Sequence, residues 1–181
     1  MNPSLLPLVS LDCPGCEGVL EGENNSLLFF CPRCGAGLDV TVSPPRVLQP
    51  LCLPRPADWG REEVVRDQPF WFFPRSRDTR APGIWVGAVR IRHQSQYGDL
   101  GLFLTRKGWR LPEGVPFTPG RGILPADRGL ERARTLALAD PSLNGTEPEG
   151  EALLVRVPCL LTPRGWKDAL LGWITPAGVL I

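Results

Sequence analysis

The sequence predicts an α+β fold that is mostly β: a small three-stranded module at the N-terminus, followed by a β-rich domain with one main helix. Proline (21) and glycine (20) together exceed a fifth of the 181 residues, which favours many turns and few long helices. The apolar residues gather in short runs, and six tryptophans and seven phenylalanines supply side chains that suit strands and a core.

The chain divides by composition into three parts. We expect the N-terminal module over residues 1–43, a proline-rich connector over 44–68 and the β-rich domain over 69–181. The connector contains "SPPRVLQPLCLPRPADWG", whose prolines favour an extended chain with at most a short edge strand at 46–49.

The β-rich domain is expected to contain one helix among several strands. Strands are predicted at 69–74, 83–92, 100–106, 151–161 and 168–174. The helix is predicted over 126–140, with Asp127 as its N-cap and Pro141 just beyond its end.

Four of the six cysteines form two identical C-P-x-C pairs: Cys13 with Cys16, and Cys31 with Cys34. Two residues between cysteines allow a tight knuckle, and two knuckles joined by a hairpin can form a tetrahedral cage of four sulfurs. Soft thiolates select zinc or iron over magnesium or calcium. A disulfide framework is disfavoured because no secretion signal is recognisable, and a thioredoxin-like redox site needs only one such pair.

The residues between and after the knuckles are consistent with a small sheet. A strand begins at 19–20, "GENN" at 22–25 is a turn, and strands return at 26–30 and 37–42. Gly35 follows the second pair, where a knuckle requires a small residue. Glu17 holds that place after the first pair, and Gly18 comes next.

Residues 11–43 resemble a zinc ribbon of the type found in transcription factors, RNA polymerase subunits and the primosomal helicase. This resemblance implies that Cys13, Cys16, Cys31 and Cys34 are metal ligands. The half-site "CPRCG" also resembles rubredoxin, which binds iron, although the cysteine pairs of rubredoxin lie much farther apart. We therefore expect one structural zinc ion, with iron as the alternative. Ribbons serve nucleic-acid binding, protein docking and stabilisation alike.

The motif "PFWFF" after the connector is similar to a strand in a loose group of bacterial proteins with no assigned activity. The similarity implies only the architecture of a ribbon joined to a β-rich domain. Arginine outnumbers lysine 18 to 2, a bias typical of GC-rich bacterial genomes.

Charge is unevenly distributed although the formal net charge is only +1. Five acidic residues and one arginine give residues 11–43 a net charge of −4. Basic residues gather instead within 74–110, interleaved with Trp71, Trp85, Tyr97 and Trp109. The candidate nucleic-acid or anion contacts in this region are Arg75, Arg77, Arg90, Arg92, Arg106 and Lys107. Either they bind a nucleic-acid strand by phosphate contacts and stacking, or the tryptophans face the core and the arginines face solvent.

The remaining reactive side chains give no catalytic pattern. Cys159 in an apolar strand is expected to be a buried small hydrophobe, Cys52 is the same or a spare thiol, and His93 has no acid or nucleophile near it in sequence. No phosphate-binding, hydrolase or zinc-protease motif is present. No signal peptide or transmembrane run is recognisable, which suggests the cytoplasm.

These observations favour a non-enzymatic accessory protein that docks on a protein partner as a subunit of a larger assembly. The acidic character of residues 11–43 favours a protein over a phosphate backbone as that partner. The alternative is a nucleic-acid-binding factor that uses the basic, aromatic region 74–110.

Overall fold

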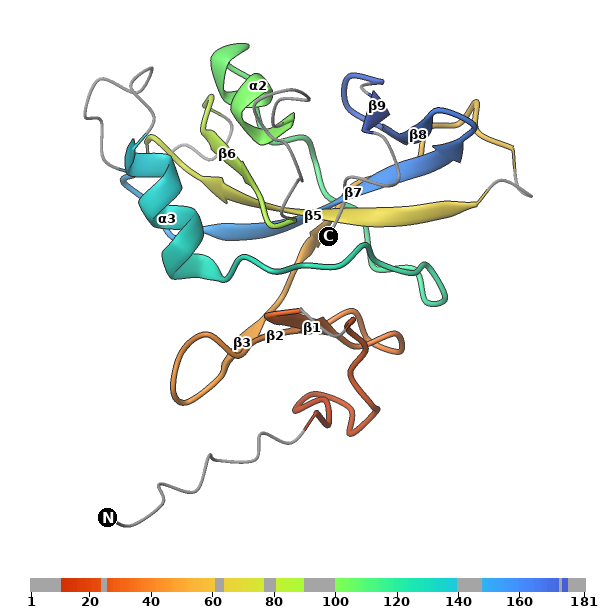
Figure 1. Ribbon diagram of the computed structural model, residues 1–181, viewed down its shortest axis with the longest axis vertical. Coiled ribbons are helices and arrows are strands. Elements are labelled where there is room, and N and C mark those ends of the chain that lie inside the picture. The colour runs from red at the N-terminus through yellow and green to blue at the C-terminus, as the bar shows by residue number, and fades with distance from the viewer. Residues whose placement is uncertain are drawn as a thin grey trace.

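The computed structural model describes residues 11–23, 26–60, 64–76, 81–89, 100–139, 148–172 and 174–175. The fold is α+β and mostly β, as the sequence predicted. Two antiparallel-dominated sheets and two helices account for the regular structure of these residues (Figure 1). Neither helix has the length and apolar character that a bilayer crossing requires.

The smaller sheet belongs to the N-terminal module. Its strands are β1 (Leu28–Phe30), β2 (Gly37–Asp39) and β3 (Arg46–Leu48), antiparallel and in that order. The short edge strand predicted at 46–49 is therefore present as β3. The strand predicted over 37–42 ends early, because the backbone N–H of Thr41 turns back to donate to the Asp39 carboxylate at 2.9 Å. We refer to residues 11–48 below as the cysteine module.

The larger sheet contains the other six strands. They are β4 (Leu51–Cys52), β5 (Val65–Phe73), β6 (Ile84–Gly87), β7 (Leu153–Thr162), β8 (Gly165–Asp168) and β9 (Ile174–Thr175). The order is β6-β5-β7-β8-β9, and β4 adds a short parallel pairing to β7. The long strands β5 and β7 pair from Val65 opposite Leu160 to Phe72 opposite Leu153, and they form the centre of the sheet.

Both faces of β5 are buried from Asp67 onward, which explains why its second half, residues 69–73, is continuously apolar. Phe70 and Phe72 point to one face, where they meet Trp85 with ring centroids 6.3 and 5.0 Å away. Trp71 and Phe73 point to the other face. Figure 1 shows helix α2 on one side of the sheet and the cysteine module on the other.

The strand predicted at 100–106 is wrong, because this segment is helix α2 (Leu100–Arg106). Its buried residues Leu100 and Leu104 are spaced for one helical face, and they pack beside Trp85. Thr105 accepts a hydrogen bond from the backbone N–H of Trp85 at 2.8 Å, and so satisfies part of the open edge of β6. The run is short and its first five residues are apolar or glycine, so its sequence fits either period.

The second helix, α3 (Leu130–Ala139), lies within the predicted range 126–140 but begins later than expected. Asp127 is therefore not its N-cap. Instead, the carboxylate of Asp39 in the cysteine module accepts the backbone N–H of Leu130 at 2.9 Å. The Cα of Gly129 has no room for a side chain, because an added Cβ would lie 2.3 Å from the Thr41 hydroxyl.

The strand predicted at 168–174 is also wrong in part. The chain turns between β8 and β9, because Asp168 Oδ1 accepts the backbone N–H groups of Leu170 and Leu171 at 2.8 and 2.7 Å. Gly172 completes the turn with a φ of 67°, a conformation that favours glycine. Of the strand predicted at 83–92, residues 84–87 form β6, and residues 90–92 lie outside the described part of the chain.

The cysteine module shares a core with the larger sheet. Leu28 and Phe30 of β1 belong to the same buried cluster as Trp71 and Phe73. The backbone N–H groups of Leu27 and Leu28 both donate to the carbonyl of Ala126, at 2.8 and 3.1 Å. Burial of each of these large side chains contributes about 1.5–3 kcal/mol to the stability of the fold. The module is therefore held on the larger sheet by apolar packing as well as by the covalent chain.

Candidate metal centre

The first cysteine pair lies in a knuckle that two backbone hydrogen bonds close. The N–H of Glu17 donates to the carbonyl of Cys13 at 2.8 Å, and the N–H of Cys13 donates to the carbonyl of Gly18 at 2.7 Å. Glu17 has a φ of 59°, which non-glycine residues adopt uncommonly. The absence of glycine directly after Cys16 is therefore accommodated by strain at Glu17, and the turn itself is unchanged.

The second knuckle repeats these two bonds. The N–H of Gly35 donates to the carbonyl of Cys31 at 2.9 Å, and the N–H of Cys31 donates to the carbonyl of Ala36 at 2.8 Å. Gly35 has a φ of 79°. An added Cβ there would lie 2.5 Å from the ring of Phe117, so both the backbone conformation and the close approach of this ring require glycine.

The two knuckles bring all four sulfurs to one point. Every pair of Sγ atoms in this cysteine cage lies within 4.8 Å, with Cys13 3.5 Å from Cys34 and Cys16 3.4 Å from Cys31. A regular tetrahedron with metal–sulfur bonds of about 2.3 Å has sulfur–sulfur edges of about 3.8 Å. The distances exceed the disulfide bond length of about 2.05 Å, and all six cysteines are free. The donor set therefore fits a thiolate-bound metal ion.

The surroundings shift the pKa values of two thiols of the cage, Cys31 and Cys34, in opposite directions. Burial raises the pKa of Cys31, but the backbone N–H groups of Cys34 and Arg33 and the neighbouring thiols outweigh it, and the pKa falls to about 7. The backbone N–H of Ala36 lowers the pKa of Cys34, but burial and the other thiols raise it to about 12. One thiolate thus forms readily, and its negative charge opposes ionisation of the next thiol. A bound cation would supply the positive charge that lets all four ionise.

The proposed nucleic-acid contacts are only partly described by the structure. Arg106 and Lys107 are exposed at the end of α2, and Arg75 is half-buried after β5. The remaining members, Arg77, Arg90 and Arg92, lie outside the described residues.

Two of the four aromatic residues named for that region do not face solvent, and Trp109 is half-buried. Trp71 and Trp85 are completely buried, and their Nε1 groups donate to the carbonyls of Arg128 and Trp109 at 2.9 and 3.1 Å. They are therefore core residues and offer no stacking platform for a base, whereas Tyr97 lies outside the described residues.

The two cysteines outside the cage are buried within the larger sheet. Cys159 is fully buried, as expected of a small hydrophobe, and Cys52 is 2% exposed. Burial raises the pKa of both thiols, which keeps them protonated and unreactive. His93 lies outside the described residues.

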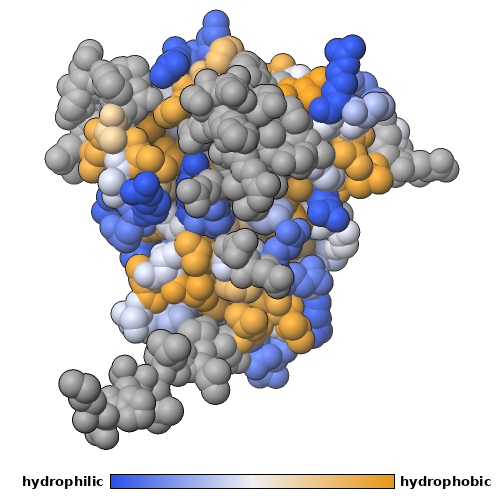
Figure 2. All heavy atoms as spheres, viewed as in Figure 1, coloured by the Kyte–Doolittle hydropathy of each residue, from blue (hydrophilic) through white to orange (hydrophobic). Residues whose placement is uncertain are grey.

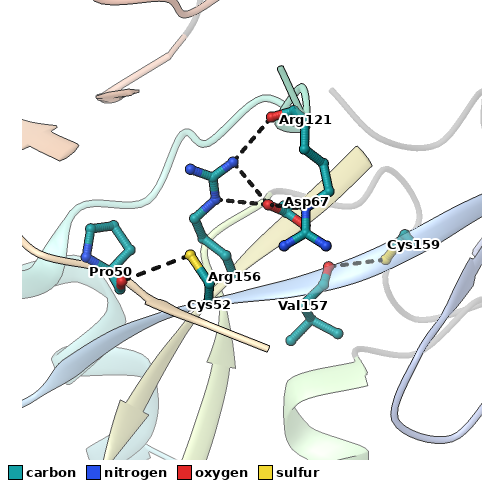
Figure 3. A network of polar contacts seen from close by, with 7 residues as sticks. All are labelled: Pro50, Cys52, Asp67, Arg121, Arg156, Val157 and Cys159. Carbon is teal, nitrogen blue, oxygen red and sulfur yellow. Dashed lines mark hydrogen bonds and ion pairs between the residues drawn. The ribbon is translucent and has the colours of Figure 1, made fainter. Parts of the chain in front are cut away.

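Sequence reasoning missed a buried charge network beside β5 and β7 (Figure 3). Asp67 Oδ2 accepts the Nε of Arg156 at 2.9 Å, and the Nε of Arg121 lies 2.9 Å from Asp67 Oδ1. The guanidinium of Arg156 also lies 4.9 Å from the ring of Phe117 and 5.9 Å from that of Phe30. Burial raises the pKa of Asp67, and the two guanidinium groups offset this only in part. No local signal could reveal the network, because Asp67 and Arg156 are 89 residues apart.

The fold and the site together define a mostly β, α+β protein with a four-cysteine site placed to hold a metal ion. Comparison of the chain with protein-family models, with curated proteins and with solved structures finds no significant match. The resemblance to zinc ribbons therefore rests on the cysteine spacing, the two knuckles and the small sheet.

Proposed function

We propose that the protein is a non-enzymatic accessory protein whose cysteine cage binds one structural zinc ion and whose cysteine module docks on a protein partner. The exposure of Val19 is the observation that carries this proposal. Val19 lies beside the first knuckle and is 71% exposed, the largest value among the exposed large apolar residues of the described chain.

Val19 is an exposed apolar residue with acidic neighbours. Asp12 pairs with Val19 across the first knuckle, and Leu11, 41% exposed, is the next residue along, with its carbonyl accepting the N–H of Leu20 at 2.7 Å. Asp12 and Glu17 are exposed next to these residues. An apolar centre with a polar rim is typical of protein interfaces. In Figure 2 apolar atoms reach the surface in the lower part of the molecule, where Figure 1 shows the cysteine module.

Zinc is supported over iron by the fourteen residues between the cysteine pairs, because the pairs of the iron protein rubredoxin lie much farther apart. In the cage every ligand is a protein thiolate, which makes a closed site. Such a site leaves no open coordination position for a substrate. Support for a non-enzymatic role comes also from Cys52 and Cys159, since both remaining thiols are buried.

The experiment compares Val19→Glu with Leu138→Glu in purification of the tagged full chain from its native host. Leu138 is the matched control, because it is an exposed apolar residue (50%) on α3. We expect a stoichiometric protein partner to co-purify with the wild type and Leu138→Glu, and to be lost with Val19→Glu while zinc content stays the same. Retention of the same partner by Val19→Glu would exclude docking at this surface.

A further inference from the structure

Residues 117–122 form a loop in the segment between α2 and α3, and contacts hold this loop at both ends. Phe117 packs against the guanidinium of Arg156 and against Gly35 of the second knuckle. At the other end the carbonyl of Arg121 accepts from Arg156 at 3.2 Å, and the carbonyl of Gly122 accepts the N–H of Asp67 at 2.9 Å. The loop between these anchors is therefore preorganised by buried contacts.

The tip of this loop is exposed to solvent although both of its ends are anchored. Residues 118–120 are exposed, and an added Cβ on Gly120 would meet no atom within 4 Å. A rigidly anchored loop with an open tip is a common way to present polar groups to a ligand.

Arg121 belongs both to the loop and to the buried charge network, so its guanidinium group places a positive charge beside the open tip. Asp67 supplies one negative charge to two guanidinium groups, so the Asp67–Arg156–Arg121 network has a net charge of +1. Figure 3 shows the carboxylate between the two arginines. Arg121 uses its Nε for Asp67, and within the described residues its two Nη groups have no hydrogen-bond acceptor. Its side chain is 13% exposed, so this charge reaches solvent only through a narrow opening.

A cleft of about 350 Å³ lies at this opening. This volume is within the range of about 300–1,000 Å³ that small-molecule sites occupy. Leu53, Val65 and Val115 form its apolar wall, and Arg55 adds a second guanidinium group, held by the carbonyl of Gly60. Among the described residues that line the cleft none is acidic, and the remaining ones are Thr118, Pro119, Gly120 and Arg121.

We propose that this cleft binds a small organic anion, with its carboxylate or phosphate group on Arg55 and Arg121 and a short apolar body against Leu53, Val65 and Val115. The planar guanidinium groups match both oxyanions, and the ligand supplies the negative charge that the network lacks. The site is separate from the cysteine cage and does not depend on docking by the module.

The experiment titrates the full, metal-loaded chain with pentanoate, butyl phosphate and pentanamide, three probes that carry the same alkyl chain. Calorimetry measures affinity, and backbone amide NMR shifts locate the site. We expect millimolar binding of at least one anion and no binding of the neutral amide. The preferred anion distinguishes a carboxylate ligand from a phosphate ligand.

Arg55→Gln should weaken anion binding by about tenfold to a hundredfold, the effect of losing a charge-assisted hydrogen bond. Arg164→Gln is the matched control, because Arg164 is exposed and lies outside the cleft. The proposal is overturned by an absence of binding for both anions, by equal binding of the amide, or by unchanged affinity in folded Arg55→Gln. If Arg55→Gln does not fold, amide shifts in the wild type decide: changes confined to 53–55 and 118–121 support the site, and changes elsewhere overturn it.

Discussion

Asp39 of the cysteine module caps helix α3: its carboxylate accepts the backbone N–H of Leu130 at 2.9 Å, from 91 residues away in the sequence. The carboxylate is fully buried and also accepts the N–H of Thr41. One side chain therefore ends β2 and begins α3. The orientation of the cysteine module against the larger sheet is therefore linked to the start of this helix.

Asp39→Ala should lower the free energy of unfolding by about 1–2 kcal/mol, because α3 loses its cap and two backbone N–H groups lose their acceptor. Asp39→Asn should lower the free energy of unfolding by less, since the amide oxygen of asparagine can still accept one hydrogen bond. Urea unfolding followed by circular dichroism measures both, with the exposed Asp12→Ala as control. Equal stability of Asp39→Ala and the wild type would contradict the capping role.

Cys31→Ser should abolish stoichiometric zinc binding, because three thiolates leave the cage open. The binding free energy of structural zinc is on the order of 10 kcal/mol and contributes to folding. Since Leu28 and Phe30 share the core of Trp71, we expect the loss to lower the melting temperature of the whole chain.

Elemental analysis and calorimetry test this expectation, and Cys52→Ala is the matched control because its thiol is buried outside the cage. The wild type and Cys52→Ala should each contain one zinc per chain. A wild type that contains neither zinc nor iron near stoichiometry would contradict the metal site itself.

Metal affinity should fall on acidification, and more steeply below pH about 7 than above it. All thiols must lose their protons to bind the metal. The pKa of Cys31 is lowered to about 7, so above this pH its thiol is already ionised and releases no proton. Below it, metal binding must displace one more proton, which steepens the slope of log affinity against pH. Competition with a chromogenic chelator measures this slope, and an equal slope on both sides of pH 7 would contradict the assignment.

Asp67→Asn should destabilise the fold by about 3–5 kcal/mol, because it leaves the guanidinium groups of Arg156 and Arg121 without a counter-charge in the interior. Asp58→Asn is the control, since Asp58 is exposed. Urea unfolding is the measurement. A change below about 1 kcal/mol would show that the aromatic rings around Arg156 suffice to stabilise it.

Nucleic-acid binding should be weak, with a dissociation constant near 10⁻⁴ M at physiological salt, about the weak limit of non-specific binding. The reasons are the net charge of +1 and the burial of Trp71 and Trp85. Fluorescence anisotropy with labelled single- and double-stranded oligonucleotides at two salt concentrations measures it. Micromolar binding with a steep salt dependence, lost in Arg106→Ala with Lys107→Ala, would place nucleic-acid binding ahead of protein docking.

The sequence alone determined the features that depend on neighbouring residues. Two residues between cysteines are enough to close a knuckle, so the spacing of Cys13, Cys16, Cys31 and Cys34 anticipated the cage. The mostly apolar runs at 69–74 and 151–161 likewise anticipated strands, which the structure has as parts of β5 and β7.

The tertiary structure alone decided the features that join distant segments. Residues 100–106 form a helix because their apolar face packs against β6, although their sequence suits a strand equally well. The cap of α3 comes from Asp39, and Asp67 meets Arg156 only where β5 and β7 pair. Each of these contacts depends on chain segments that folding brings together, and their individual sequences carry no local trace of the partner.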